Sequence, residues 1–416
     1  DTNLEVFVDK LDDGKPREKG TPPFFMSSSS ITIASSTFVM TNENLKNKKI
    51  LDFSDLNIQA SDFQIVGPEV NLSINDMSFD SGRGIHVDRM RTDFKYTKEQ
   101  MRFDSLNIET PGSLLNGNLV FNYDRKDFRD FFNLVKLDAQ FVDSKVAFDE
   151  INLVYDQFGK GKEVTFSSNL SGVLNDLNTE DLFLLSDNTG IRGDFNFKNL
   201  FDRNEGFIMD AKMKNVTSSY YQLRALMPNI LGKTLPPSIF KKLGQFTIRG
   251  NALVTETSIE AKVNINTAIG SSYTDLTLTD VNNIDNATYK GFVSLIDFDL
   301  GSFANNRRLG KATLDFNVEG RSFLTNRLNT EVIGDIYSLV FNGYEYNNLK
   351  VSGILKEQLF DGSVTSNDEN LKFDFKGLAD FASDRNNFNF IASVAYADLK
   401  KLNFIKIYLL LVIYFY

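Results

Sequence analysis

The residues that could do chemistry are few and lie far apart. His86 is the only histidine, and the chain has no cysteine. A histidine-based metal centre needs several such ligands, and a thiolate nucleophile or a disulfide needs cysteine. No serine lies in a Gly-x-Ser-x-Gly nucleophile motif. Because His86 alternates with Ile85 and Val87, we expect it to be a solvent-facing strand residue.

Two short motifs resemble known sites but lack their essential parts. Gly232-Lys233-Thr234 resembles the end of a phosphate-binding loop, yet Met227 occupies the position of that loop's first glycine. Asp280–Asp285 has carboxylates without the spacing and glycine of a calcium loop, so it predicts a polar turn. We therefore expect no enzyme activity, no cofactor and no metal.

The charge balance excludes one class of partner. The formal net charge is −10 and the isoelectric point is about 4.9. A protein that binds nucleic acid needs a basic face for the phosphates, and no run of Lys and Arg marks a patch for anionic membranes. We expect no nucleic acid partner.

Alternation of apolar and polar residues is the main pattern of the chain. Leu314, Phe316 and Val318 alternate with polar residues before Gly320, and Leu371, Phe373 and Phe375 do so before Gly377. Such a period of two places one side of a strand on an apolar surface. The chain also has 38 Phe and 14 Tyr but no Trp. We expect roughly 25–30 short strands, most of them closed by Gly, Asn or Asp.

Interruptions of the alternation predict the organisation of the chain. Leu51–Phe53 and Leu56–Ala60 predict two separate strands, Ile151–Tyr155 predicts another, and turns are expected at Asn342-Gly343 and Asp361-Gly362. Helical spacing predicts short helices near 124–134 and 218–243. The expected segments are 1–123 with a polar insertion at 10–30, 124–243 ending in the helical interruption, 244–404, and an apolar tail at 405–416. We interpret that tail as a truncation artefact.

The pattern predicts an all-β fold with minor α content. A sandwich, a solenoid and a membrane barrel fit less well, because the sequence shows no crossing connections, no fixed repeat length and no aromatic girdles. We expect a long, continuous, antiparallel-rich sheet folded into an elongated U-shaped, taco-like hydrophobic groove.

A groove lined by alternating apolar residues would suit acyl chains, because each CH₂ moved into water costs ~0.8 kcal/mol. Ordinary core packing explains each residue equally well. The expected lining residues are Leu119, Phe121, Phe195, Phe197, Phe207, Met209, Ile248, Val263, Ile265, Leu314, Phe316, Leu371, Phe373 and Phe375.

Four segments resemble the AsmA-like superfamily of bacterial envelope proteins, most closely its translocation and assembly module type (TamB type) of Bacteroidetes. They are 81–123 (from SGRGIHVDRM), 223–254 (LRALMPNILGKTLPPSIFKK onward), 309–323 (LGKATLDFNVEGRSF) and 342–381 (NGYEYNNLKVSGIL onward). The segments span residues 81–381, which is most of the chain, and the resemblance lies in their order and spacing.

The resemblance implies a periplasmic bridge that moves phospholipid between the inner and outer membranes and supports outer-membrane biogenesis. It implies an inner-membrane anchor and a C-terminal domain that meets an outer-membrane barrel protein, neither of which we find in this sequence, so we expect a central fragment. It implies no catalytic motif. The alternatives are a scaffold for the assembly of outer-membrane proteins and a structural envelope or surface β-fibre.

Overall fold

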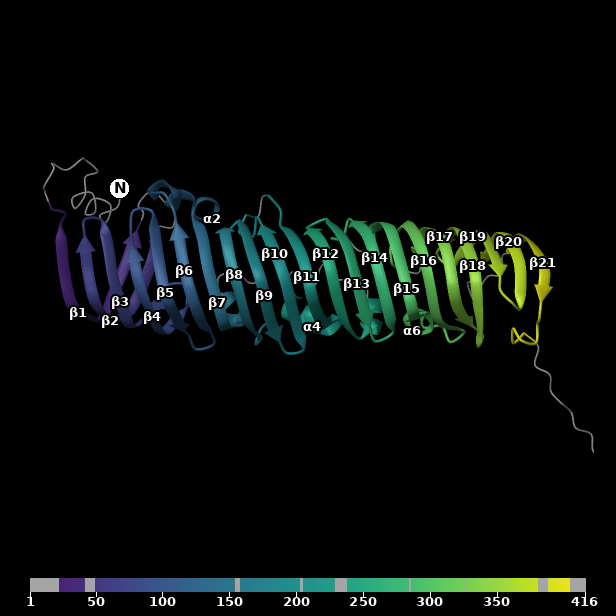
Figure 1. The fold of residues 1–416 in the computed structure, drawn as a ribbon, viewed down its shortest axis with the longest axis horizontal. Coiled ribbons are helices and arrows are strands. Elements are labelled where there is room, and N and C mark those ends of the chain that lie inside the picture. The colour runs from purple at the N-terminus through teal and green to yellow at the C-terminus, as the bar shows by residue number, and fades with distance from the viewer. Residues whose placement is uncertain are drawn as a thin grey trace, which may run out of the picture. The chain divides into compact units, whose positions relative to one another are not determined.

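The computed structural model describes residues 22–41, 49–153, 158–202, 205–228, 238–283, 286–324, 326–380 and 388–404. The chain forms two compact units. The first contains residues 1–211 and 225–230, and the second contains residues 212–224 and 231–416. Each unit is a curved antiparallel sheet with a few short helices at the strand ends (Figure 1).

In the first unit, each strand from β1 to β9 pairs antiparallel with the next strand along the chain. Its elements are β1 (Phe25–Thr41), β2 (Lys49–Val66), β3 (Glu69–Ser81), β4 (His86–Tyr96), β5 (Gln100–Glu109), β6 (Leu114–Asn122), the 3₁₀ helix η1 (Arg125–Asp130), α2 (Phe131–Leu134), β7 (Lys136–Ala147), α3 (Phe148–Ile151), β8 (Glu163–Val173), β9 (Asp176–Ser186) and β10 (Thr189–Lys198). The strand β11 (Ile208–Ser219) and the helix α4 (Tyr220–Leu226) have residues in both units.

The second unit follows the same rule from β12 to β21. Its further elements are the 3₁₀ helix η2 (Ser238–Leu243), β12 (Gln245–Thr255), β13 (Ser258–Thr267), β14 (Gly270–Thr279), β15 (Thr288–Asp299), α6 (Leu300–Ala304), β16 (Leu309–Arg321), β17 (Asn329–Phe341), β18 (Tyr344–Lys356), β19 (Leu359–Asn367), β20 (Leu371–Asp380) and β21 (Phe388–Ala397).

The all-β, antiparallel fold class is confirmed, but the described residues form 21 strands, fewer than expected. Several strands are long and irregular. Leu51–Phe53 and Leu56–Ala60 lie in the single strand β2, in which Asp55 has φ 50°. The prediction of two strands there was wrong, because a bulge interrupts the alternation without ending the strand.

Bulges of one kind recur in the first unit. Asp143 has φ 45°, lies where the register of β7 and β8 shifts, and donates its N–H to Ser167 Oγ at 2.9 Å. Ser105 and Asp181 repeat this arrangement with Asn118 Oδ1 and Asp194 Oδ1 on the adjacent strand, each at 2.9 Å. Asp, Asn and Ser tolerate this left-handed conformation better than bulkier residues do. Bulges bend a strand and increase its twist, so they curve the sheet.

Glycines occupy the interiors of the strands in the second unit. Gly377 has φ 138° within β20, and Gly320 lies within β16. Our expectation that a glycine ends its strand was wrong for Gly377, whereas Gly320 lies one residue before the end of β16. Asp361-Gly362 likewise lies inside β19, and the chain turns before it at Glu357, whose φ is 57°. The turn at Asn342-Gly343 is confirmed, with positive φ at both residues.

The helical predictions are confirmed where the structure describes them. Helices η1 and α2 occupy the region predicted at 124–134, and α4 and η2 lie within 218–243, whose residues 229–237 fall outside the described chain. The expected strand at Ile151–Tyr155 is wrong in its first residue, since Ile151 ends α3, and residues 154–157 lie outside the described chain.

The expected polar loop at 10–30 is wrong from Phe25 onward, because β1 begins there; residues 10–21 lie outside the described chain, as does the tail at 405–416. The division into three segments and a tail stays a prediction.

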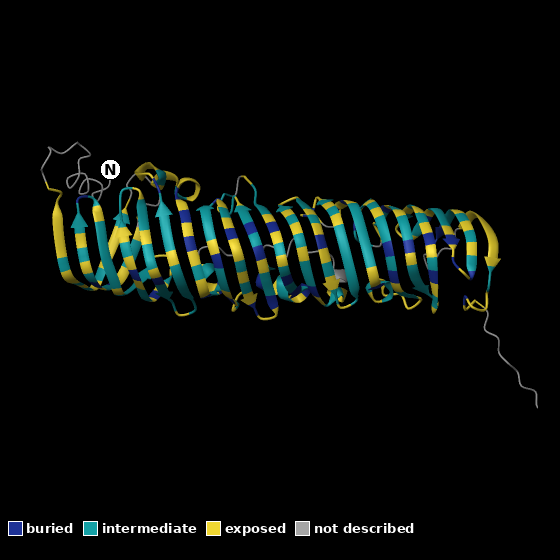
Figure 2. Cartoon of the chain, in the orientation of Figure 1, coloured by how far each residue is buried: buried dark blue, intermediate teal, exposed yellow. Residues whose placement is uncertain are grey.

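Burial follows the alternation of the sequence, as the bands along the strands show (Figure 2). In the first unit, Phe148 of α3 and Leu226 pack on Val164 of β8. In the second unit, Leu402 packs into a cluster with Ala312, Leu314, Ile336, Tyr346 and Leu349. One side of each sheet is thus buried, and we call it the inner face.

Candidate functional site

The strand register brings the predicted residues of the second unit into rows on the inner face. Partners in consecutive strands form one row of Ile248, Ile265, Ser272, Leu295, Leu314, Ile336, Leu349, Ser366, Phe373 and Val394. The adjacent row is Gly250, Val263, Thr274, Val293, Phe316, Gly334, Val351, Val364, Phe375 and Ala392. These two rows hold seven of the expected lining residues, and Leu371 lies on the same face two residues before Phe373.

The first unit has two rows of the same kind. One is Phe103, Leu119, Ala139, Leu170, Thr179 and Phe195, and the other is Met101, Phe121, Leu137, Gly172, Leu177 and Phe197. Phe207 lies just before β11, with its ring centroid 6.4 Å from that of Phe197. Met209 is half-buried in β11. The residues expected to act together therefore share a face within each unit.

Burial separates the expected lining residues into two groups. Phe195, Val263 and Leu314 are buried, and the other eleven are half-buried. Leu314 is 6 % exposed and lies in the cluster around Leu402, which is 1 % exposed. That part of the inner face is a packed core. The half-buried majority keeps surface that a bound apolar molecule could cover.

Some aromatic rings on the inner face cover glycines of neighbouring strands. A Cβ built on Gly334 would lie 2.7 Å from Cδ1 of Phe316, and one on Gly362 would lie 2.8 Å from Cζ of Phe360. Such rings compensate for the side chain that a strand glycine lacks. Phe316 thus has a structural contact in addition to its exposed surface.

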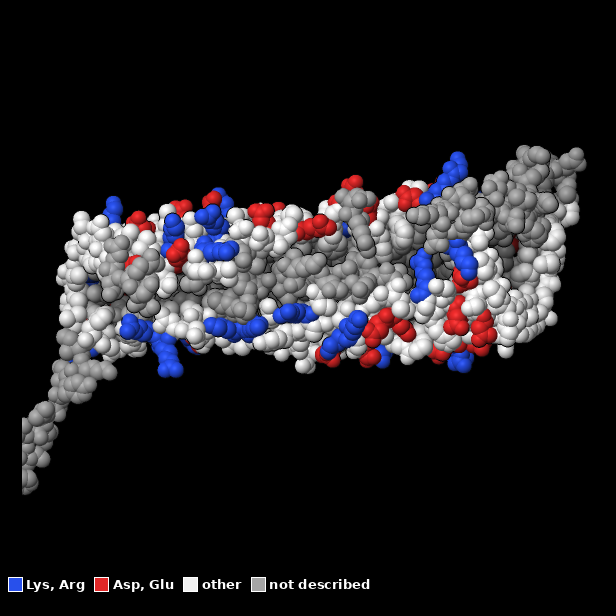
Figure 3. Space-filling view, turned by 180° about the vertical axis from the view of Figure 1, so that it is seen from behind, with Lys and Arg blue, Asp and Glu red and all other residues white. Residues whose placement is uncertain are grey.

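The opposite, outer face carries the charges. Lys262 Nζ lies 3.0 Å from Asp275 Oδ2, and Lys290 Nζ lies 2.8 Å from Glu319 Oε2, each pair joining adjacent strands. Exposed pairs like these contribute at most about 1 kcal/mol each. From behind, charged side chains gather along the long borders of each unit (Figure 3). The inner face contributes no residue to these pairs.

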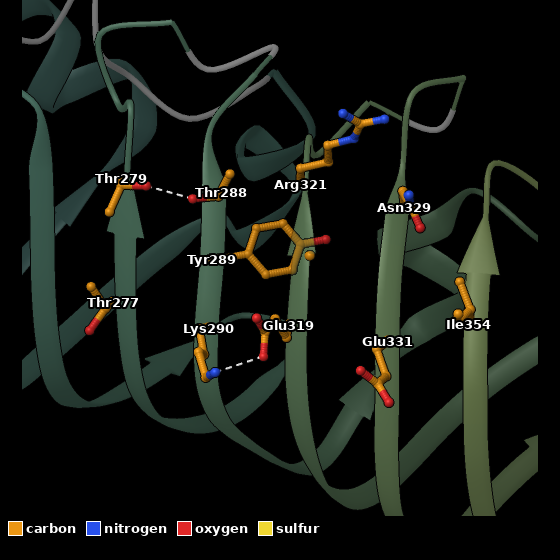
Figure 4. Close-up of a pocket in the computed structure, with 11 residues that line it drawn as sticks. Thr277, Thr279, Thr288, Tyr289, Lys290, Glu319, Arg321, Asn329, Glu331 and Ile354 are labelled. Atoms are coloured by element: carbon orange, nitrogen blue, oxygen red, sulfur yellow. Dashed lines mark hydrogen bonds and ion pairs between the residues drawn. The ribbon is translucent and has the colours of Figure 1, made fainter.

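A polar hollow of about 700 Å³ lies at the ends of strands β14 to β18. It is lined by Thr277, Thr279, Thr288, Tyr289, Lys290, Glu319, Gly320, Arg321, Asn329, Glu331 and Ile354 (Figure 4). Figure 4 also shows these strands curving back at their lower ends. Tyr289 is hydrogen-bonded to Thr330, and burial raises the pKa of its hydroxyl despite the opposing effect of that bond. Two of its four charged residues, Lys290 and Glu319, pair with each other, and the lining shows no nucleophile beside a general base.

Asp368 is the most buried carboxylate of the second unit, at 1 % exposure. It accepts hydrogen bonds from Tyr344 Oη at 2.6 Å and from the N–H groups of Asn347 and Asn370 at 2.8 Å. Burial alone would raise its pKa, but these donors together lower it. The carboxylate therefore joins the start of β18 to the turn between β19 and β20.

His86 lies at the exposed start of β4, in agreement with its predicted solvent-facing position. Its Nδ1 lies 2.6 Å from Asp80 Oδ1, and its Nε2 lies 3.3 Å from Asp88 Oδ1. The hydrogen bond with Asp80 is the largest cause of a raised His86 pKa. The side chain is exposed, so this shift belongs to a surface group.

Two further features bear on the chemistry of the described residues. They contain no group of three or more side chains suited to hold a metal ion. No described helix is both long and apolar enough to cross a lipid bilayer.

Sequence reasoning missed many residues of the rows, although the signal was present. Val351 and Val364 alternate with polar neighbours in the same way as the chosen residues. The pairing of strands, which the sequence does not state, was needed to show that they continue the same rows.

The chain was compared with protein-family models, curated proteins and solved structures, and none of them matches. The resemblance to AsmA-like proteins therefore stays a prediction.

Proposed function

We propose that the inner face binds the acyl chains of phospholipids and carries them along the sheet. The observation that supports this most is the register of the second unit, in which two adjacent rows place apolar side chains on consecutive strands. Most of these side chains are only half-buried. Strands lie ~4.8 Å apart, so an acyl chain that crosses from β15 to β20 meets an apolar side chain of at least one row on every strand, whereas on β14 the two positions are Ser272 and Thr274.

The energetic reason is the cost of exposing an acyl chain. Each CH₂ group transferred to water costs ~0.8 kcal/mol, so a chain of about 16 carbons faces more than ~10 kcal/mol. An apolar row lowers this cost continuously. The charged outer face would leave lipid head groups in water.

Photo-crosslinking tests the proposal directly. Benzoylphenylalanine is placed at Phe375 on the inner face or at Ile354 on the outer face, and each protein is irradiated with vesicles of phosphatidylethanolamine and phosphatidylglycerol. We expect lipid adducts at Phe375 and not at Ile354, measured by mass spectrometry. Equal adducts at both positions, or none at Phe375, would contradict the proposal.

A charge on the inner face gives a second test. Phe373→Asp should lower the lipid bound per protein by about tenfold, equivalent to ~1.4 kcal/mol, because a carboxylate in an apolar row disfavours acyl chains. Ile333→Asp, on the exposed outer face, is the matched control and should bind lipid normally. Circular dichroism must show intact strands in both variants. A folded Phe373→Asp protein with normal lipid content would contradict binding of acyl chains to the inner face.

The setting of this activity is part of the proposal. From the resemblance to AsmA-like proteins we propose that the lipid path lies in the bacterial periplasm, between an inner-membrane anchor and an outer-membrane barrel partner. Cell fractionation followed by lipid analysis tests this setting. We expect the protein in the envelope fraction with bound phospholipid; a lipid-free protein in the cytosolic fraction would contradict it.

The edge strands favour the alternative of a scaffold for the assembly of outer-membrane proteins. Among the described strands, β1 pairs only with β2 and β21 only with β20, and neither edge strand contains a charged residue. Natural sheets usually protect such edges with charges or Pro, and an uncharged edge can accept another strand. Cysteine crosslinks from Ser393 of β21 to another protein, without lipid adducts at Phe375, would favour this alternative.

A further inference from the structure

An exposed group of aromatic rings lies beside the inner face of the first unit. We call it the rim aromatic cluster; it consists of Phe128, Phe131 and Phe132 in η1 and α2, and Phe201 after β10. Phe128, Phe132 and Phe201 are 40–45 % exposed, and Phe131 is half-buried. Exposed apolar groups gathered at one place, rather than scattered singly, mark an interaction site.

The cluster is continuous with the inner face. The ring of Phe121, which belongs to an inner-face row, lies 5.7 Å from the ring of Phe131. Phe131 contacts Phe132 at 6.1 Å, and Phe132 stacks on Phe201 at 5.0 Å. Apolar surface therefore runs without interruption from the inner face to the border of the sheet where strand β6 ends and β7 begins.

A buried asparagine holds the exposed rings in place. Asn175, which is buried in the turn between β8 and β9, donates its N–H to the carbonyl oxygen of Phe132 at 3.0 Å. Its Oδ1 accepts the N–H of Phe201 at 2.9 Å, and its Nδ2 donates to Asn133 Oδ1 at 2.9 Å. These bonds satisfy a buried polar side chain and fix α2 against the loop after β10. The stacked pair is thus positioned in advance.

The charges around the cluster are balanced. Residues 124–130 contain three cations, Arg125, Lys126 and Arg129, and three carboxylates, Asp124, Asp127 and Asp130. A surface with both signs close together complements a head group that carries both a phosphate and an ammonium. It offers no uniform field for a polyanion.

We propose that the rim aromatic cluster is the entry site at which a phospholipid with a zwitterionic head group passes its acyl chain over the edge of the sheet onto the inner face. This inference rests on the proposed function. The preformed stack of Phe132 and Phe201 receives the acyl chain, and Phe131 and Phe121 continue its path. The head group stays beside the charged residues of η1.

The test compares the rate of lipid uptake with the final amount bound. The protein is mixed with phosphatidylcholine vesicles that contain a self-quenched fluorescent phosphatidylcholine, and dequenching is followed in time. The double variant Phe132→Ser/Phe201→Ser should take up lipid about tenfold more slowly and reach the same final loading. Asn175→Ala should slow uptake as well, since it releases the stack without removing a ring.

A matched double variant supplies the control. Phe183 and Leu185 on β9 are 38 % and 44 % exposed, similar to Phe132 and Phe201, and Leu185 lies on the outer face opposite inner-facing Leu184. Phe183→Ser/Leu185→Ser should leave the uptake rate unchanged. Equal slowing of both double variants would overturn the entry site, as would an unchanged rate or a loss of final loading in Phe132→Ser/Phe201→Ser.

The failure of the two proposals can be told apart. If the unaltered protein never acquires lipid, the proposed function itself fails. If it acquires lipid at the same rate with and without the rim rings, only the entry site fails.

Discussion

The two units of this protein curve their sheets by different means. The first unit uses bulges whose left-handed residue is a Ser or Asp, such as Ser105 and Asp143, with the N–H bonded to a side chain of the adjacent strand. The second unit uses one such bulge at Asp297, but mainly glycines within its strands, such as Gly291 with φ 142° and Gly377 with φ 138°. Only glycine adopts that conformation without strain.

The difference has a consequence for the inner face. A polar bulge keeps every inward side chain, whereas a glycine removes one. In the second unit, Gly353, Gly362 and Gly377 are partners on three consecutive strands, so their row has no side chains and nearby rings such as that of Phe360 cover it. Curvature in the second unit therefore depends mainly on backbone freedom, and in the first unit mainly on hydrogen bonds to side chains, although Gly172 in β8 also has a φ of 112°.

The largest effect is expected from a side chain at a strand glycine of the second unit. Gly291→Val should destabilise the protein by about 4 kcal/mol, because it combines backbone strain with overpacking. A Cβ there would lie 2.1 Å from the carbonyl oxygen of Asp275. Urea denaturation measures the change. Gly161→Val is the control, since the φ of Gly161 is also positive, at 66°, but no atom lies within 4 Å of a Cβ built there. Equal losses of stability in both variants would show that the close approach to Asp275 is not the cause.

Acid should weaken the second unit through Asp368. The pKa of this carboxyl is lowered in the folded state. The ionised carboxylate therefore stabilises the fold above the unfolded pKa, and this stabilisation is lost as the pH falls through the folded pKa. Asp368→Ala should cost about 3 kcal/mol at neutral pH, because three donors lose a charged acceptor. Hydrogen exchange of Asn347 and Asn370 checks this. Unchanged protection in the variant would show that the carboxylate does not hold these segments.

A substitution at a polar bulge should separate the two ways of bending. Asp143→Val should cost about 2 kcal/mol, because a β-branched residue is strained at positive φ. Asp143→Gly should be nearly neutral, since glycine accepts the φ of 45°. Thermal unfolding compares the pair. A Gly variant as unstable as the Val variant would mean that the side chain of Asp143, and not its backbone, supports the bend.

The smallest effect is expected at His86 in the first unit. The pKa of His86 is raised in the folded state, chiefly by the hydrogen bond with Asp80. Protonated His86 therefore stabilises the fold fully below the unfolded pKa, and this stabilisation is lost as the pH rises through the folded pKa. The single histidine gives one set of imidazole NMR signals, which should titrate above the usual range near 6.5. Asp80→Asn should return the midpoint toward that range, and a midpoint that does not move would exclude Asp80 as the cause.

The sequence predicted the strands better than their ends. Alternation around Leu314 and Phe373 identified inward residues that the register then placed in one row. Gly377 and Asp361-Gly362 misled the prediction, because a glycine that bends a strand looks the same as one that ends it. The rim aromatic cluster was also partly visible, since the helix near 124–134 was predicted, but its contact with Phe201 was not.

By itself, the sequence determined the fold class, the polar and apolar sides of the strands and the scarcity of catalytic groups, because these depend on residue type and on spacing along one strand. The tertiary structure decided what depends on residues distant in the chain. Strand pairing set the rows, and Leu402 turned part of the inner face around Leu314 into a packed core. Asn175 joined Phe132 to Phe201 across loops that are far apart in sequence. No local pattern encodes these contacts, since each arises only when the strands pair and bring distant loops close together.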